Sequence, residues 1–162
     1  TELAPDFSDG WANLSALQAV LGDAADAART LAEGLRQCPQ SPGLHLQYAR
    51  NLQQAGRIPE AIAEFQTSIR FRPNEPDAYL ELANLYFRLG RNAEGLAEME
   101  RVLLTEPAHP QALGILALHA IMSGNEEEAQ RRVTAARNQP RVPPEQMQEL
   151  VSAFRKQFGR AP

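Results

Sequence analysis

The chain has 162 residues, of which 43% are hydrophobic and 22% are charged, and its formal net charge is −4. The acidic balance argues against a nucleic-acid partner, because phosphate binding requires a concentrated basic surface, and no apolar run reaches the roughly 18 residues of a membrane-spanning helix. The single cysteine, Cys38, excludes an internal disulfide and a cysteine-based zinc site. These features indicate a soluble folded domain and leave its compartment open between cytoplasm and periplasm.

Four glycines recur every 34 residues, and five further columns of residues keep the same spacing. A fixed period of this length is typical of stacked helical hairpins. The glycines are Gly22, Gly56, Gly90 and Gly124, and the prolines are Pro5, Pro39, Pro73 and Pro107. The remaining columns are Trp11, His45, Tyr79 and Leu113; Leu14, Tyr48, Leu82 and Leu116; Ala27, Ala61, Gly95 and Ala129; and Leu31, Phe65, Met99 and Val133.

Each column predicts a part of a two-helix unit. Glycine suits the turn between the two helices, because a helix C-terminus needs a residue that tolerates positive φ. The column prolines end the second helix, and Pro42, Pro76 and Pro110 open the next first helix, where proline sacrifices no hydrogen bond. The alanine column predicts a close approach of the two helices. Gly95 permits that approach but weakens its helix by roughly 0.5–1 kcal/mol.

In chain order, the period divides the sequence into six segments. Residues 1–7 match the tail of a preceding repeat whose body is missing, because Pro5 is in phase with the helix-ending prolines. We therefore expect the chain to be a fragment of a larger protein. Repeat 1 is predicted at 8–41, repeat 2 at 42–75, repeat 3 at 76–109 and repeat 4, with a degenerate end, at 110–143.

Residues 144–162 are predicted to form a C-terminal helix and tail. A helix over this segment places five apolar side chains on one stripe, namely Met147, Leu150, Val151, Phe154 and Phe158. Two interpretations stay open. The helix either caps the last repeat, with its polar side outward, or binds another chain.

The segment PDAYLELANLYFRLGRNAEGLAEMERVLLTEP (76–107) resembles a tetratricopeptide repeat. Its matching residues stand where that family places its signature, and they are Tyr79, Leu82, Tyr86, Gly90, Met99 and Pro107. The resemblance covers residues 8–137. It implies an all-α fold, a right-handed α-solenoid of antiparallel helix pairs.

The same resemblance implies a concave groove, lined by the first helices, that receives a peptide or a helix of a partner protein. The groove residues implied here form a partly apolar track: Leu46, Arg50, Gln53, Leu80, Asn84, Phe87, Arg88, Leu118 and Ile121. The roles of the two arginines stay open. Arg50 and Arg88 either hold a carboxylate or backbone carbonyls of the ligand, or they pair with Glu81 along the groove.

No pattern in the sequence indicates catalysis. His45 stands in the aromatic column, where it substitutes for a core aromatic residue, and there is no HExxH, glycine-rich phosphate loop or GxSxG motif. The sequence therefore predicts a protein-interaction scaffold without catalytic residue, cofactor or metal. Two alternatives stay open: a recruiting or regulatory domain of a larger enzyme, and a self-association module that forms a homo-oligomer.

Overall fold

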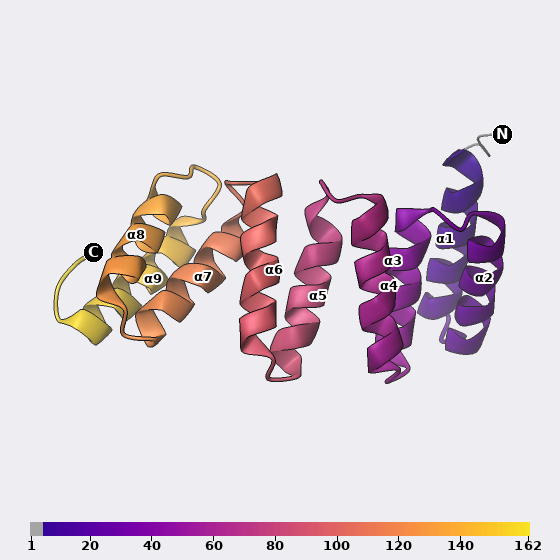
Figure 1. Cartoon of the computed structure of the whole chain (residues 1–162), viewed down its shortest axis with the longest axis horizontal. Helices are drawn as coiled ribbons and strands as arrows, with labels where there is room; N and C mark the ends of the chain where they lie inside the picture. The colour runs from indigo at the N-terminus through magenta and orange to yellow at the C-terminus, as the bar shows by residue number, and fades with distance from the viewer. Residues whose placement is uncertain (1–4) are drawn as a thin grey trace. The chain divides into compact units, whose positions relative to one another are not determined.

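The computed structural model describes residues 5–162, and every regular element in that range is an α-helix (Figure 1). The helices are α1 (Pro5–Val20), α2 (Ala24–Gln37), α3 (Pro42–Gln54), α4 (Ile58–Phe71), α5 (Pro76–Arg88), α6 (Asn92–Thr105), α7 (Pro110–Met122), α8 (Glu126–Arg137) and α9 (Pro144–Phe158). They form two compact units, of which the first ends at Leu82, within α5, and the second begins at Ala83.

The first unit contains two complete helix pairs. Figure 1 shows α1 beside α2 and α3 beside α4, and α3 also packs against α2 and α1. The turns inside the pairs contain Gly22 with φ 89° and Gly56 with φ 76°, a backbone region that glycine enters without steric cost. The turn glycines predicted from the period are therefore confirmed.

The predicted columns form the core of each pair. Ala27 and Ala61 are at most 1% exposed, and Phe65, from the column that follows the alanine column, is fully buried. In the second unit, Ala129 and Val133 of the same two columns are fully buried. These residues are buried because the two helices of a pair approach too closely to leave room for water at this level.

The aromatic column does more than fill space. Tyr79 is 7% exposed, and its hydroxyl donates a hydrogen bond of 3.0 Å to the carbonyl of Pro73. One period earlier, Nε2 of His45 lies 3.0 Å from the carbonyl of Pro39. The prediction that His45 is a core residue is confirmed, because it makes the same contact to a helix-ending proline that Tyr79 makes.

His45 has a second polar partner in the first unit. Its Nδ1 lies 2.6 Å from the carboxylate of Glu64, and its ring stacks on Phe71 with 5.5 Å between ring centroids. Both ring nitrogens thus have partners within the helix pair. A histidine held in this way is positioned for packing rather than for catalysis.

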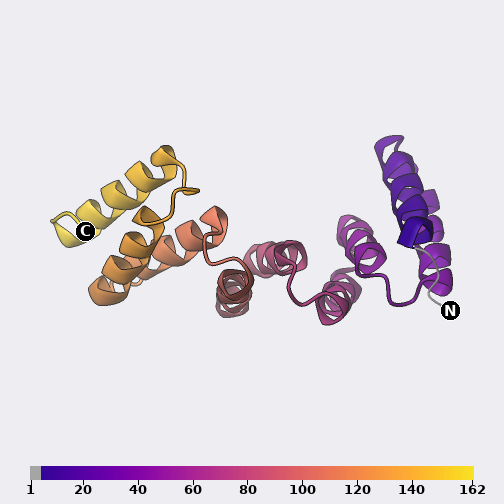
Figure 2. The same cartoon turned by 90° about the horizontal axis from the view of Figure 1, so that it is seen from above.

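The core of the second unit joins α7, α8 and α9, which lie together in orange and yellow in Figure 2. Leu150 and Phe154 of α9 are buried, while Met147 and Phe158 are partly buried against the same core. The predicted apolar stripe is therefore confirmed for four of its five residues, and Val151 is not part of this core. Because α9 packs against both α7 and α8, it caps the fourth helix pair.

The start of the first helix differs from the sequence-based expectation. α1 begins at Pro5 and not at Ser8, so Pro5 lies in the first turn of a helix, where proline is tolerated. The expectation for Thr1–Ala4 lies outside the described residues. The repeat boundaries at 8–41, 42–75, 76–109 and 110–143 stay predictions.

The burial of Tyr79 generates a prediction about stability. Tyr79→Phe keeps the ring and removes one hydrogen bond, which should cost about 0.5–1.5 kcal/mol of unfolding free energy. Tyr79→Ala also leaves a cavity and should cost about 3–5 kcal/mol. Urea denaturation followed by circular dichroism measures both values. A cost below about 1 kcal/mol for the alanine variant would contradict the assigned burial.

The buried Glu98 of α6 generates a prediction about pH. Burial raises the pKa of its carboxyl above the ordinary value of 4.5, and this outweighs the opposing effect of Arg101, whose Nη1 lies 3.1 Å away. A raised pKa favours the folded state below the unfolded value, and the advantage is lost as pH rises through the folded value. Glu98→Gln should therefore raise the melting temperature at pH 7, with little difference at pH 4.

A matched control lies on the same helix. The hydrogen bond from Arg91 lowers the pKa of the exposed Glu94, so its ionised form favours the folded state. Glu94→Gln should then lower the melting temperature at pH 7, opposite in sign to Glu98→Gln. Melting curves at the two pH values test both, and a loss of stability for Glu98→Gln at pH 7 would refute the assignment.

Candidate functional site

The structure distributes the predicted groove residues over both units and leaves them unequally accessible. In the first unit, Leu46, Arg50 and Gln53 of α3 and Leu80 of α5 are half-buried. In the second unit, the exposure ranges from open to fully buried. Asn84 and Arg88 are exposed, Phe87 is half-buried, Leu118 is 43% exposed and Ile121 is only 2% exposed.

Arg50 pairs with Glu81, which decides between its two interpretations. Nε and Nη2 of Arg50 donate hydrogen bonds of 3.0 and 2.8 Å to the same carboxylate oxygen of Glu81, joining α3 to α5 within the first unit. Both side chains remain partly exposed, so the pair contributes at most about 1 kcal/mol. In the described part of the chain, Arg88 makes no hydrogen bond or ion pair and keeps its charge free for a ligand.

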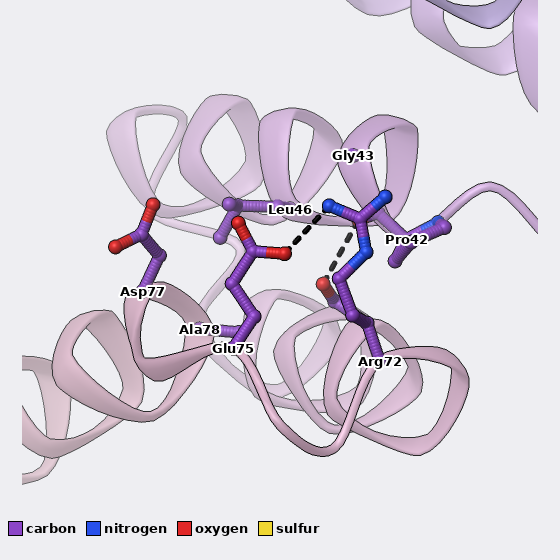
Figure 3. A pocket seen from close by; sticks show the side chains of 8 residues that line it. Pro42, Gly43, Leu46, Arg72, Glu75, Asp77 and Ala78 are labelled. Atoms are coloured by element: carbon purple, nitrogen blue, oxygen red, sulfur yellow. Dashed lines mark hydrogen bonds and ion pairs between the residues drawn. The ribbon is translucent and has the colours of Figure 1, made fainter. Parts of the chain in front are cut away.

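A hollow of about 80 Å³ lies beside Leu46 in the first unit. Pro42, Leu46 and Ala78 supply apolar walls, and the ion pair between Arg72 and Glu75 stands at its mouth (Figure 3). This hollow has room for a small apolar side chain. A charged side chain would compete with the ion pair between Arg72 and Glu75.

Phe87 has a different position from the one predicted. A Cβ atom on Gly95 would lie 2.6 Å from Cε1 of Phe87, so the Phe87 ring fills the space that an alanine would occupy in the small-residue column. Phe87 therefore packs between α5 and α6, with only part of its surface left for a ligand. This contact also explains why the column contains glycine here.

Ile121 is the clearest correction to the predicted groove. It belongs to the buried core that α7 and α8 form with α9, together with Val133 and Phe154. The sequence placed Ile121 on the open face of α7, but α9 and α8 cover it. We therefore remove Ile121 from the candidate surface.

The covering helix also supplies residues that sequence reasoning missed. Nε2 of Gln146 donates a hydrogen bond of 2.9 Å to the carbonyl of Pro110, and a Cβ atom on Gly114 would overlap this amide. Gly114 stands in the column that contains Leu46 and Leu80 in earlier repeats. Glycine in place of leucine at this position was the sequence feature that could have indicated a helix packed against α7 here.

Leu118 borders a hollow of about 240 Å³ between α7 and α9. Ile115 and Leu150 provide its apolar surface, and Gln111, Gln146 and Glu149 provide its polar surface. An exposed leucine next to an open apolar hollow is typical of a binding surface.

Two kinds of site are not observed in residues 5–162. No group of three or more His, Cys, Asp or Glu side chains lies close enough to hold a metal ion. In the same range, none of the helices combines the length and apolar character needed to cross a membrane.

Family models match the middle of the chain. The model described as "TPR repeat" matches residues 51–90, and the one described as "Tetratricopeptide repeat" matches residues 80–140. No curated protein matches the chain by sequence.

Three solved structures with the same fold are between 15% and 20% identical to this chain in sequence. A tetratricopeptide repeat protein from Parabacteroides merdae has 19% identity and a TM-score of 0.77, and the match covers 95% of this chain and 61% of that protein's chain. MamA from Desulfovibrio magneticus RS-1 has 20% identity and a TM-score of 0.70, and the match covers 95% of this chain and 87% of the MamA chain. The pilF protein of Pseudomonas aeruginosa has 15% identity and a TM-score of 0.70, covering 93% and 70%. These similarities show an α-helical repeat solenoid.

The contact between Phe87 and Gly95 generates a prediction that opposes helix propensity. Gly95→Ala should destabilise the protein by about 1–3 kcal/mol, because the added methyl group overlaps a packed ring. Gly43→Ala, in α3 with open space around its Cα, should be neutral or stabilise by up to about 1 kcal/mol. Thermal unfolding of both variants tests this.

Repeating Gly95→Ala in a Phe87→Ala protein tests whether Phe87 causes the destabilisation. In a Phe87→Ala protein the overlap disappears, so Gly95→Ala should no longer destabilise. A penalty that stays unchanged in that background would show that another neighbour of Gly95, and not Phe87, limits the space.

Proposed function

This chain belongs to the tetratricopeptide repeat family, whose repeats serve as protein-interaction scaffolds, and we propose that it binds an apolar segment of a partner protein. Each unit offers its own contact surface on its first helices, here called an inner face. The inner face of the first unit consists of Leu46, Gln53 and Leu80, and that of the second unit consists of Asn84, Arg88 and Leu118, with Phe87 contributing the exposed part of its ring. The scaffold acts by binding, without catalysis.

The observation that carries this proposal is the exposed Leu118 beside its apolar hollow. A side chain of the partner that enters the hollow would cover Leu118, Ile115 and Leu150 together. Covering a half-exposed leucine contributes on the order of 1 kcal/mol. The hollow between α7 and α9 is preformed, so little ordering entropy opposes binding.

The charged residues of this surface indicate which kind of partner segment it can bind. Glu81 neutralises Arg50, and the mouth of the hollow beside Leu46 is occupied by the Arg72–Glu75 pair. In the first unit, a ligand carboxylate would have to displace one of these partners and would also meet the exposed Asp77. The inner face of the first unit therefore favours an uncharged apolar segment over an acidic one. Arg88 and Asn84 can orient its backbone carbonyls.

The test combines capture with a matched pair of variants. The intact chain, Leu118→Asp and Leu104→Asp serve as baits, because Leu104 is 82% exposed on α6 but lies away from the hollow at Leu118. The segment of the captured protein that binds is then titrated against each bait by fluorescence anisotropy. Leu118→Asp should lose affinity about tenfold or more, which corresponds to roughly 1.4 kcal/mol, and Leu104→Asp should bind like the intact chain.

Arg88→Glu tests the polar part of the surface. It should weaken binding by about 0.5–1.5 kcal/mol, because a donor to the ligand backbone is lost. Equal binding by all baits, with unchanged helicity, would place the interaction elsewhere on the molecule. Phe87 is unsuitable as a test position, since its ring also supports the α5–α6 packing at Gly95.

A further inference from the structure

A charge pair joins two successive first helices in the first unit. Arg50 of α3 donates two hydrogen bonds to the carboxylate of Glu81 on α5, and the two residues stand 31 positions apart in the sequence. The helices α3, α5, α7 and α9 each begin with a proline, and these prolines are 34 residues apart. Equivalent places on these four helices can therefore be compared.

In the second unit, the places of this pair are occupied by Leu118 on α7 and Glu149 on α9. Leu118 stands two periods after Arg50, and Glu149 stands two periods after Glu81. α7 packs against α9, and Leu118 and Glu149 line the same hollow of about 240 Å³. The acid of the pair is thus kept at this step, whereas a leucine replaces its arginine.

Glu149 has no cation that takes the place of the missing arginine. Its side chain is exposed and, within residues 5–162, makes no hydrogen bond or ion pair. The residues one turn away on α9 are Glu145, Gln146, Ser152 and Ala153. None of these is basic, and the lining of the hollow contains no Lys, Arg or His. The inner face of the second unit therefore presents an apolar hollow with an uncompensated negative charge at its side.

Filling the hollow changes the surroundings of that charge. While the hollow is open, water hydrates the carboxylate of Glu149, and an exposed carboxylate needs no partner. An apolar side chain that covers Leu118 displaces water from the same hollow, so the carboxylate loses part of its hydration. In the drier surroundings an opposite charge nearby is favoured more strongly, and a second negative charge is opposed more strongly.

We propose that the partner segment supplies the missing cation, as an arginine next to the apolar side chain that fills the hollow. This inference rests on the proposed function, because it requires a segment bound at Leu118. Arginine suits the site better than lysine, since a guanidinium places two donors on one carboxylate, as Arg50 does on Glu81. Its methylene stem also covers apolar surface. Glu149 repels phosphate groups, so nucleic acid and anionic lipid are opposed as occupants.

The first test introduces the cation into the chain itself. Leu118→Arg should restore the pair, so its melting temperature should be higher by roughly 1–3 °C in the intact background than in a Glu149→Gln background, after correction for Glu149→Gln alone. Asn84→Arg is the control, because it stands one period earlier, where the residue in the place of Glu149 is the uncharged Ile115. It should have the same effect in both backgrounds. An equal effect of Leu118→Arg in both would overturn the inferred geometry.

The second test identifies the preferred segment. A random peptide library displayed on phage is selected on the intact chain, after peptides that bind the Leu118→Asp chain have been removed. The retained peptides should contain an arginine next to an apolar residue. In a synthetic peptide of such a sequence, replacing the arginine with glutamine should weaken binding about three- to tenfold, and replacing it with lysine should weaken binding less.

The matched variants of the chain separate this inference from the proposed function. Glu149→Gln should weaken the arginine peptide as much as the glutamine replacement does, and should not weaken the glutamine peptide further. Glu127→Gln removes an exposed acid of α8 that does not line the hollow, and should bind like the intact chain. Peptides that depend on Leu118 but neither on arginine nor on Glu149 would overturn the inference and leave the proposed function standing. A selection without any Leu118-dependent peptide would overturn both.

Discussion

The close approach of two helices within each pair is the constraint on which the rest of the structure depends. Ala27, Ala61 and Ala129 are almost completely buried, because at this level the partner helix lies against their Cβ atoms. A turn glycine with positive φ then returns the chain after each first helix, as at Gly22 and Gly56. The repeated hairpin fixes which side of each first helix is exposed, so the core columns also decide where surface residues lie.

Three buried glycines inside helices show how neighbouring side chains pack where a Cβ atom is missing. In each case the freed space is occupied by a neighbouring side chain: Trp11 lies over Gly34, Phe87 over Gly95 and Gln146 over Gly114. Dense packing leaves no void at a missing Cβ. As a result, Phe87 and Gln146 lose part of their freedom as surface groups. At these three buried positions, the glycine marks a residue elsewhere that packs into the space of the missing Cβ atom; the exposed Gly10 and Gly43 have open space instead.

The sequence predicts the hairpins well because their determinants repeat every 34 residues and act locally. The turn glycines, the buried columns, the role of His45 and the apolar stripe of α9 were all visible in the pattern. The candidate site was less predictable, because accessibility depends on contacts outside the period. Ile121 is buried by the packing of α9 and α8 over α7, and Arg50 is held by Glu81, one of two partners the sequence allowed.

The leucines of the first helices differ in what surrounds them. On the inner faces, leucines such as Leu46 and Leu118 lie beside hollows and charged side chains, a mixture that suits a transient ligand segment. On α1, Leu14 and Leu17 are exposed, whereas Leu82, two periods after Leu14, and Leu85, two periods after Leu17, are buried. In the second unit, α9 covers the pair α7–α8 with its own apolar residues. Whether a leucine of a first helix is accessible therefore depends on which helix packs against it, and not on the column to which it belongs.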